Sequence, residues 1–281
     1  MIESISPLIV LVGLLIGSYT DFMTREVPDW LNFALMGIGF GLAVLASFIY
    51  ASYSYLIEAV AGFVLTLGIA LLMFYTGQWG GGDSKMIMAL GALLGLDIFH
   101  LEYLDYSLIS FLFNALVVGA AYGVLWSVYL SIKHRKKFMK EFRKLSGRKE
   151  MKPVALITFL VFALAFFTQN LFFQIILILG GSIGLLYLLW HIIKVIETAC
   201  MHKFVSPQKL TEGDWIATEV MVNRKYIAGP KDLGITKKQI RQLVRLGVSQ
   251  VKIKEGIPFV PSFLLAFVVT WMYGNVLFLF V

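Results

Sequence analysis

Two aspartates, Asp21 and Asp83, lie at the ends of apolar stretches, where helix packing alone does not require a carboxylate. An ionisable residue in a membrane-embedded sequence is a candidate functional residue because placing a charge in lipid is costly. Two close carboxyl groups that share one proton can activate water. The ionised group takes a proton from water, while the protonated group donates a hydrogen bond to a peptide carbonyl. The pair therefore predicts amide hydrolysis that needs neither a metal nor another cofactor.

The three glycines before Asp83, which are Gly80, Gly81 and Gly82, are expected to shape the backbone of this site. Consecutive glycines give up side-chain packing and are costly to order, so they are typical of a sharp bend or of close approach to the main chain. Each aspartate also has a structural interpretation, Asp21 as the end of a helix and Asp83 as the cap of the next one. Lys85 is expected to be an anchor at the membrane interface.

The composition is that of a polytopic membrane protein. Of the 281 residues, 59% are hydrophobic and only 15% are charged. Six or more stretches approach the roughly 20 apolar residues that cross a hydrocarbon core about 30 Å thick, and they lack the alternation of a barrel strand. The predicted fold class is an all-α membrane bundle of about eight transmembrane helices with a small α+β cytoplasmic domain. Six spans remain if the hairpin 153–193 does not cross.

The distribution of basic residues predicts the topology. The expected segments are approximately 7–20, 30–51, 56–78, 86–99, 106–132, 153–168, 171–193 and 259–281. The positive-inside rule puts Arg25 and the ten Lys and Arg residues of 133–152 in the cytoplasm, so both termini are expected outside and both aspartates near the cytoplasmic face. Segment 86–99 is too short to cross a bilayer by itself, which predicts a water-filled pocket around Asp83.

Five parts are expected along the chain. They are the N-terminal helices with both aspartates, a basic cytoplasmic loop held by anionic lipids, a helical hairpin, a small cytoplasmic domain and a C-terminal helix, at 1–132, 133–152, 153–193, 194–257 and 258–281. In the small domain, alternation predicts strands at 215–222 and 249–253. Thr236 and Gln239 predict a capped helix that stops at Gly247. The domain is interpreted as a scaffold or a substrate-docking module.

The remaining composition limits other functions. The net charge of +7 follows the membrane topology, so nucleic acid is not an expected partner. Cys200 is the only cysteine, which excludes an internal disulfide and a cysteine-based zinc site. The four histidines, His100 among them, show no ligand spacing. Because Met1–Ser4 lacks a basic region, the first segment is expected to be a retained helix.

At these residues the sequence resembles the GxGD membrane aspartic peptidases, and within them the type IV prepilin and archaeal preflagellin peptidases. Three features carry the resemblance, namely Thr20-Asp21 followed by Arg25 and Pro28, Gly80-x-Gly82-Asp83 followed by Lys85, and Pro258-Phe-Val-Pro261 before the last helix. The resemblance implies an aspartic endopeptidase of the plasma membrane with Asp21 and Asp83 as its dyad. Its expected activity is removal of the short basic leader from type IV pilin-like or flagellin-like precursors.

Other residues and other functions stay open. Gly80 to Gly82, Pro258 and Pro261 are expected to shape the site, whereas Glu26 and Asp29 are either loop charges or contacts for a basic substrate segment. The lone Cys200 differs from the paired cysteines of bacterial relatives and favours an archaeal-type enzyme with peptidase activity alone. The alternatives are a proton-coupled transporter that uses the same carboxylates, a presenilin-like protease that cleaves within a membrane helix, and a scaffold of the pilus machinery.

Overall fold

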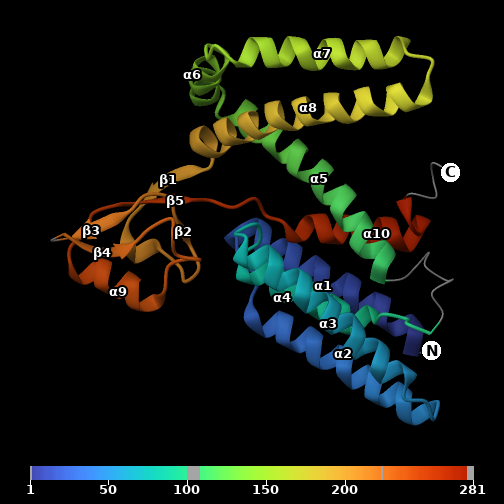
Figure 1. The fold of residues 1–281 in the computed structure, drawn as a ribbon. Helices are drawn as coiled ribbons and strands as arrows, with labels where there is room; N and C mark the ends of the chain where they lie inside the picture. Colours follow the sequence, from blue (N-terminus) through green and yellow to red (C-terminus); the bar gives the residue numbers. More distant parts are fainter. Residues whose placement is uncertain (1, 100–107, 223, 277–281) are drawn as a thin grey trace. The chain divides into compact units, whose positions relative to one another are not determined.

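The computed structural model describes residues 2–99, 108–222 and 224–276. The chain forms two compact units, one made of Met1–Val124 with Gly256–Val281 and the other of Leu125–Glu255. We describe the two units separately (Figure 1).

The first unit is a bundle of apolar helices. It contains α1 (Ile2–Thr24), α2 (Asp29–Ile49), α3 (Ser54–Tyr75), α4 (Gly81–Leu94), the first part of α5 (Leu108–Lys133) and α10 (Val260–Tyr273). The short helix α4 packs against α3, α2 and α1, and α1 also packs against α10, although these two helices are far apart in the sequence (Figure 1). The site residues are therefore held by helices from both ends of the chain.

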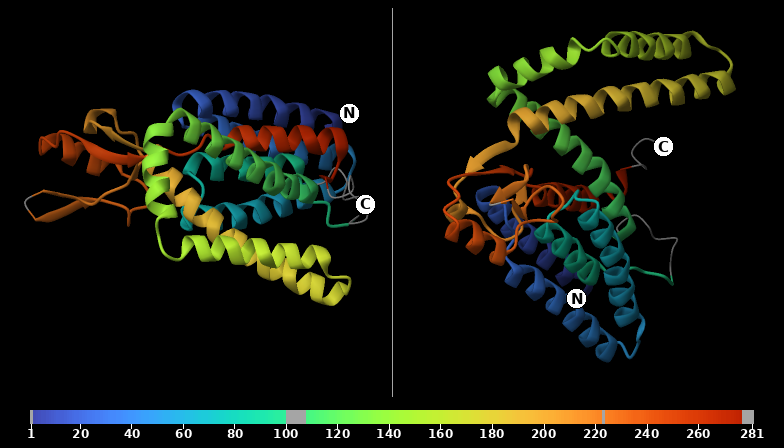
Figure 2. Two further views of the ribbon diagram at one scale, coloured as in Figure 1. Left: turned by 90° about the horizontal axis from the view of Figure 1, so that it is seen from above. Right: turned by 60° about the vertical axis from the view of Figure 1, so that its left-hand side comes forward.

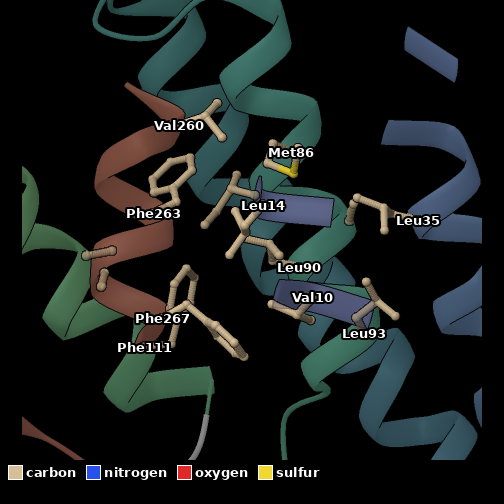
Figure 3. Close-up of a cluster of buried hydrophobic side chains, with 14 of the residues drawn as sticks. Val10, Leu14, Leu35, Met86, Leu90, Leu93, Phe111, Val260, Phe263 and Phe267 are labelled. Carbon is tan, nitrogen blue, oxygen red and sulfur yellow. The ribbon is translucent and has the colours of Figure 1, made fainter. Parts of the chain in front are cut away.

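The core of this unit surrounds α4. Met86 and Leu90 of α4 are fully buried, together with Leu14 of α1 and Phe263 of α10 (Figure 3), and so is Ile87 of α4. Eight of the 14 residues of α4 are buried, which is the pattern of a helix with neighbours on most of its faces. This burial explains why so short a helix has a fixed position in the bundle.

Glycines allow the helices around α4 to approach closely. A Cβ atom on Gly62 of α3 would lie 2.3 Å from the carbonyl oxygen of Gly91 on α4. In the contact with α2, a Cβ atom on Gly39 would lie 2.9 Å from the carbonyl carbon of Ala92. Small residues at helix contacts are characteristic of membrane bundles, where close packing takes the place of the hydrophobic effect. Helix α4 is thus tightly packed between α2 and α3.

The second unit begins with the last part of α5, which is followed by an amphipathic helix and a helical hairpin. These three helices are α6 (Arg135–Ser146), α7 (Met151–Phe167) and α8 (Leu171–Cys200). Helices α7 and α8 lie side by side (Figure 2), and the Asn170 side chain caps α8 by accepting a hydrogen bond from the N–H of Phe173. The expected hairpin is therefore confirmed. The basic segment predicted as a loop contains α6, whose Phe138 and Phe142 pack with Leu188 and Ile192 of α8.

The small domain has two short sheets and one helix. Its elements are β1 (His202–Val205), the 3-10 helix η2 (Pro207–Lys209), β2 (Trp215–Ile216), β3 (Val220–Val222), β4 (Lys225–Ala228), α9 (Lys237–Arg245) and β5 (Val251–Lys254). Strand β5 pairs antiparallel with both β1 and β2, and β3 forms a hairpin with β4. The capping box of Thr236 and Gln239 is confirmed. The single strand predicted at 215–222 is wrong, because β2 and β3 belong to different sheets.

The predicted number of transmembrane helices is a little high. In the described part of the chain, five helices are long and apolar enough to cross a membrane, at Ile5–Thr24, Asp29–Ile49, Ser54–Tyr75, Leu108–Lys133 and Leu171–Cys200. A sixth is obtained if α6 and α7, which are bent by 82°, count as one broken span. Three of the expected spans, α4, α7 and α10, are shorter, at 14, 17 and 14 residues. Residues 277–281 of the last predicted segment lie outside the described residues.

Candidate functional site

Asp21 lies within α1, not in a turn that follows it. The predicted end of the first segment near Thr20 is wrong by one helical turn, because α1 continues to Thr24. The helix ends at Arg25, whose N–H donates to the carbonyl of Asp21 at 3.0 Å and whose φ is +62°. The Asp21 side chain is buried, with 5% of its surface exposed.

The Asp21 carboxylate binds the N-terminus of α10. Its Oδ2 accepts a hydrogen bond of 2.9 Å from the N–H of Val260, the first residue of that helix. The first N–H groups of a helix have no partner within the helix, and the helix dipole favours a negative charge at this end. The next residue, Pro261, has no N–H group, and the N–H of Ser262 donates to the carbonyl of Phe259 at 2.9 Å. Asp21 therefore supplies the partner that Val260 needs.

Asp83 lies in the first turn of α4. Its Oδ2 accepts a hydrogen bond of 3.1 Å from the N–H of Gly80, the residue that precedes the helix. Asp83 therefore caps the start of α4, as the structural interpretation predicted, and it uses only one of its two oxygens to do so. Residue Asp83 as a whole is partly exposed, whereas Asp21 is buried.

Of the three glycines before Asp83, Gly82 permits close packing, and the three do not form a sharp bend. Gly80 has an extended backbone, and Gly81 and Gly82 begin α4. A Cβ atom on Gly82 would lie 3.2 Å from the Cβ of Val27, in the connection between α1 and α2. The buried Asn32 of α2 also donates a hydrogen bond of 3.4 Å to the carbonyl of Gly82. A close approach to the main chain was expected here, and the structure shows one: the groups that approach Gly82 are Val27 and Asn32 of this same chain.

An aromatic contact joins the segment before α4 to the start of α10. The Trp79 ring lies 5.7 Å from that of Phe259 and 5.3 Å from that of Phe263, centroid to centroid. Aromatic pairs at this separation stabilise a fixed arrangement of the elements that carry them. The backbone groups that bind Asp21 and Asp83 are therefore supported by one cluster.

The structure brings the two aspartates into one electrostatic environment. The charge of Asp21 acts on Asp83, and Asp21 also interacts with Arg25 and with Tyr122 of α5. Gly17, one turn before Asp21, allows α1 to pack closely here, because its Cβ would lie 2.7 Å from Met86 and 3.3 Å from Val260. The two carboxyl groups are thus close enough for the charge of one to act on the other.

Tyr122 is the site residue that the sequence interpretation missed. It lies one turn beyond Gly119, whose Cβ would be 3.2 Å from the ring of Phe259, on the face of α5 that packs against the start of α10. The face is also marked by Asn114, which donates a hydrogen bond of 2.8 Å to Thr270 of α10. Gly119 and Tyr122, which are three residues apart on the helix, were the available signal.

The acidic residues beside Asp21 have different surroundings. Asp29 forms an ion pair with Lys85 of α4, with 2.6 Å between Oδ1 and Nζ. The Lys85 ammonium also lies 5.6 Å from the ring centre of Phe33. Lys85, expected to be an interfacial anchor, therefore links α4 to α2. Glu26 is exposed in the connection between α1 and α2.

Metal coordination has no candidate group in the part of the chain that is described. Among those residues, no three His, Cys, Asp or Glu side chains lie together as ligands. Cys200 is a free thiol, and His100 lies outside the described residues.

The fold and the site define a polytopic helical membrane protein with a pair of interacting carboxyl groups. Residues 8–124 match the type IV leader peptidase family. This part of the chain contains both aspartates, so the similarity to that family includes the candidate site.

Three curated relatives are preflagellin peptidases. The protein of Methanococcus maripaludis is 41% identical over 85 residues, which are 30% of this chain and 36% of the relative. That of Methanococcus voltae is 28% identical over 134 residues, 44% of this chain and 55% of the relative. That of Methanocaldococcus jannaschii is 37% identical over 83 residues, 30% and 35% of the two chains. The chain thus spans between about a third and about half of the length of these relatives.

Proposed function

We propose that this protein is an aspartic endopeptidase that removes the short basic leader from type IV pilin-like or flagellin-like precursors. The observation that carries the proposal is the pairing of Asp21 and Asp83, from α1 and α4, inside the segment that matches the leader peptidase family. Carboxyl groups within membrane helices are costly, and a peptidase gives both of them a use. The names of the three relatives support a flagellin-like substrate.

The proposed chemistry needs the two carboxyl groups in different protonation states. One carboxylate accepts a proton from water as the water oxygen attacks the scissile carbonyl carbon. The other carboxyl group donates a hydrogen bond to the carbonyl oxygen and stabilises the negative charge that develops there. The packed helices around α4 hold Asp83 in place, and the N–H of Val260 holds Asp21.

The membrane setting supports cleavage at the cytoplasmic face of the plasma membrane. Arg25 and the basic residues of α6 are expected on the cytoplasmic side by the positive-inside rule, with anionic lipids as their partners. Asp21 is one turn from Arg25, so the dyad would lie close to that face. The exposed Glu26 is the acidic group best placed to bind a basic leader, because Asp29 is already paired with Lys85.

The test is cleavage of a leader-plus-helix peptide by the purified protein in proteoliposomes. Asp21→Asn and Asp83→Asn keep the shape of each side chain and remove the carboxylate, so each variant should lose activity by about 10³-fold or more. Glu141→Gln is the matched control, since it removes a carboxylate on α6 that is paired with Lys144. Normal cleavage by either aspartate variant would refute the dyad.

A further inference from the structure

The two aspartates are bound in the same way at the starts of two helices, and the residues just before those starts contact each other. We infer that Trp79 and Phe259 are positioning residues whose ring contact sets the separation of the Asp21 and Asp83 carboxyl groups. This inference rests on the proposed function, because it concerns the geometry of the proposed dyad.

Each carboxyl group accepts a backbone hydrogen bond at a helix N-terminus. The N–H of Val260, at the start of α10, donates to Asp21 at 2.9 Å. The N–H of Gly80, just before α4, donates to Asp83 at 3.1 Å. The first N–H groups of a helix have no partner within the helix, so each bond satisfies a donor that the helix leaves free. The position of each carboxyl group therefore depends on one short backbone segment.

The residue before each donor is aromatic, and the two rings are in contact. Trp79 precedes Gly80, and Phe259 precedes Val260. The two ring centroids lie 5.7 Å apart, and the fully buried Phe263 meets both rings edge-on, at 5.3 Å and 5.2 Å. Aromatic pairs at such distances contribute more than the area they bury. The contact thus joins the two donor segments through a single residue on each side.

The backbone on the Trp79 side is fixed to the end of α3. Gly77 has a φ of +69°, a left-handed conformation that glycine adopts without strain and that ends a helix. The N–H groups of Gln78 and Trp79 then donate to the carbonyl of Met73, at 2.9 Å and 3.2 Å. The Trp79 ring is therefore carried by a hydrogen-bonded helix end and not by an open loop.

The backbone on the Phe259 side is fixed by α10, and α5 leaves room for the ring. The carbonyl of Phe259 accepts hydrogen bonds from the N–H of Ser262 at 2.9 Å and from its Oγ at 2.7 Å. On α5, a Cβ atom on Gly119 would lie 3.2 Å from the Cζ atom of the Phe259 ring. The ring of Phe259 is thus held between the start of α10, Trp79 and the glycine face of α5.

The ring contact acts where the helices are least constrained. Helix ends fray more readily than helix interiors, so packing of the helix bodies alone leaves the two donor segments free to shift. A shift of about 1 Å in a catalytic group can lower the rate roughly 100-fold. Because the two rings position the dyad and not the leader, their loss should lower kcat and kcat/KM equally and leave KM little changed.

The test is a double-mutant cycle on cleavage of the leader-plus-helix peptide in proteoliposomes. Trp79→Leu and Phe259→Leu should each lower kcat by about 10-fold to 100-fold. The double variant should be no slower than the slower single variant, because both changes remove the same contact. Trp79→Phe retains a ring, so it should lose less activity than Trp79→Leu, and it takes the place of Trp79→Leu in the cycle if that variant does not fold.

Phe40→Leu is the matched control for the loss of an aromatic contact. Phe40 of α2 meets Phe63 of α3 edge-on, with 5.4 Å between the ring centroids, about midway along both helices. Thermal unfolding should show that Phe40→Leu destabilises the protein about as much as Phe259→Leu does, whereas its kcat should remain that of wild type.

Three outcomes would overturn the positioning role and leave the dyad intact. They are a kcat for Phe259→Leu that matches Phe40→Leu, a change in KM alone, and losses that add in the double variant. Unimpaired cleavage by Asp21→Asn or Asp83→Asn would instead refute the proposed function itself.

Discussion

Gly62→Ala should disturb the site from a distance through the contact between α3 and α4. The new Cβ would lie 2.3 Å from the carbonyl oxygen of Gly91 and 2.9 Å from the carbonyl carbon of Gly95, both backbone atoms of α4 or its end. Reaching an ordinary contact of about 3.4 Å requires the two helices to separate by roughly 1 Å. Helix α4 has little room to move, because Gly39 of α2 also packs closely against it at Ala92, and eight of its 14 residues are buried.

The expected magnitude follows from this displacement. Overpacking of a well-packed core costs about 1–3 kcal/mol, so Gly62→Ala should lower the free energy of unfolding by that amount. Asp83 lies at the N-terminal end of the same helix, and misplacing a catalytic group by about 1 Å can reduce the rate roughly 100-fold. We therefore expect precursor cleavage in proteoliposomes to fall by between about 10-fold and 100-fold.

The same helix offers a matched control. Gly68 also lies in α3, but a Cβ atom there would have open space around it. Gly68→Ala should leave cleavage unchanged and stabilise the helix by up to about 1 kcal/mol. If Gly62→Ala matched Gly68→Ala in both thermal unfolding and cleavage rate, the tight contact between α3 and α4 would not be what positions Asp83.

Three further predictions concern stability. Lys85→Met breaks the ion pair with Asp29, yet both ends are partly exposed, so chemical unfolding should show a loss of at most about 1 kcal/mol. Asn114→Ala removes the buried donor to Thr270 and should cost about 1–3 kcal/mol, and an unchanged melting temperature would contradict this. Burial first, and the charge of Lys252 next, lower the pKa of His202 below its usual 6.5. The unfolded state therefore binds the proton more readily, so the hydrogen-exchange protection factors of the small domain, corrected for the intrinsic exchange rate at each pH, should fall as the pH drops below about 6.5, and His202→Gln should remove this loss of protection.

The membrane helices could be predicted from the sequence because each is a long apolar run, but their ends could not. The polar residues after Thr20 indicated a turn, whereas α1 continues through Asp21 because that carboxylate finds a partner at Val260. The two residues are 239 positions apart, and no local pattern reveals such a pair. The ion pair of Lys85 with Asp29 spans 56 positions and was missed for the same reason.

The second unit shows a different limit of pattern reading. A dense run of basic residues predicted a loop, but the segment contains the helix α6. Phe138 and Phe142 are four residues apart, which is the spacing of one helix face, and both pack in a cluster with residues of α8. In the small domain, the strands β1 and β4 have four residues each, too few for alternation to be distinguished from chance. The capping box at Thr236 was predicted correctly because it depends on two residues only three positions apart.

The two prolines before and within α10 have a physical role that connects them to Asp21. Pro261 fits the first turn of a helix, where no N–H donor is needed, and would disrupt the interior. Pro258 disfavours helical backbone at the residue before it, so the helix is discouraged from starting earlier. Together they favour a start at Val260, and the contact of Phe259 with Trp79 fixes that start in the bundle. Pro258 and Pro261 carry no charge, yet their spacing determines which N–H group is free to bind Asp21. In this way the two prolines help to set the geometry of the proposed dyad.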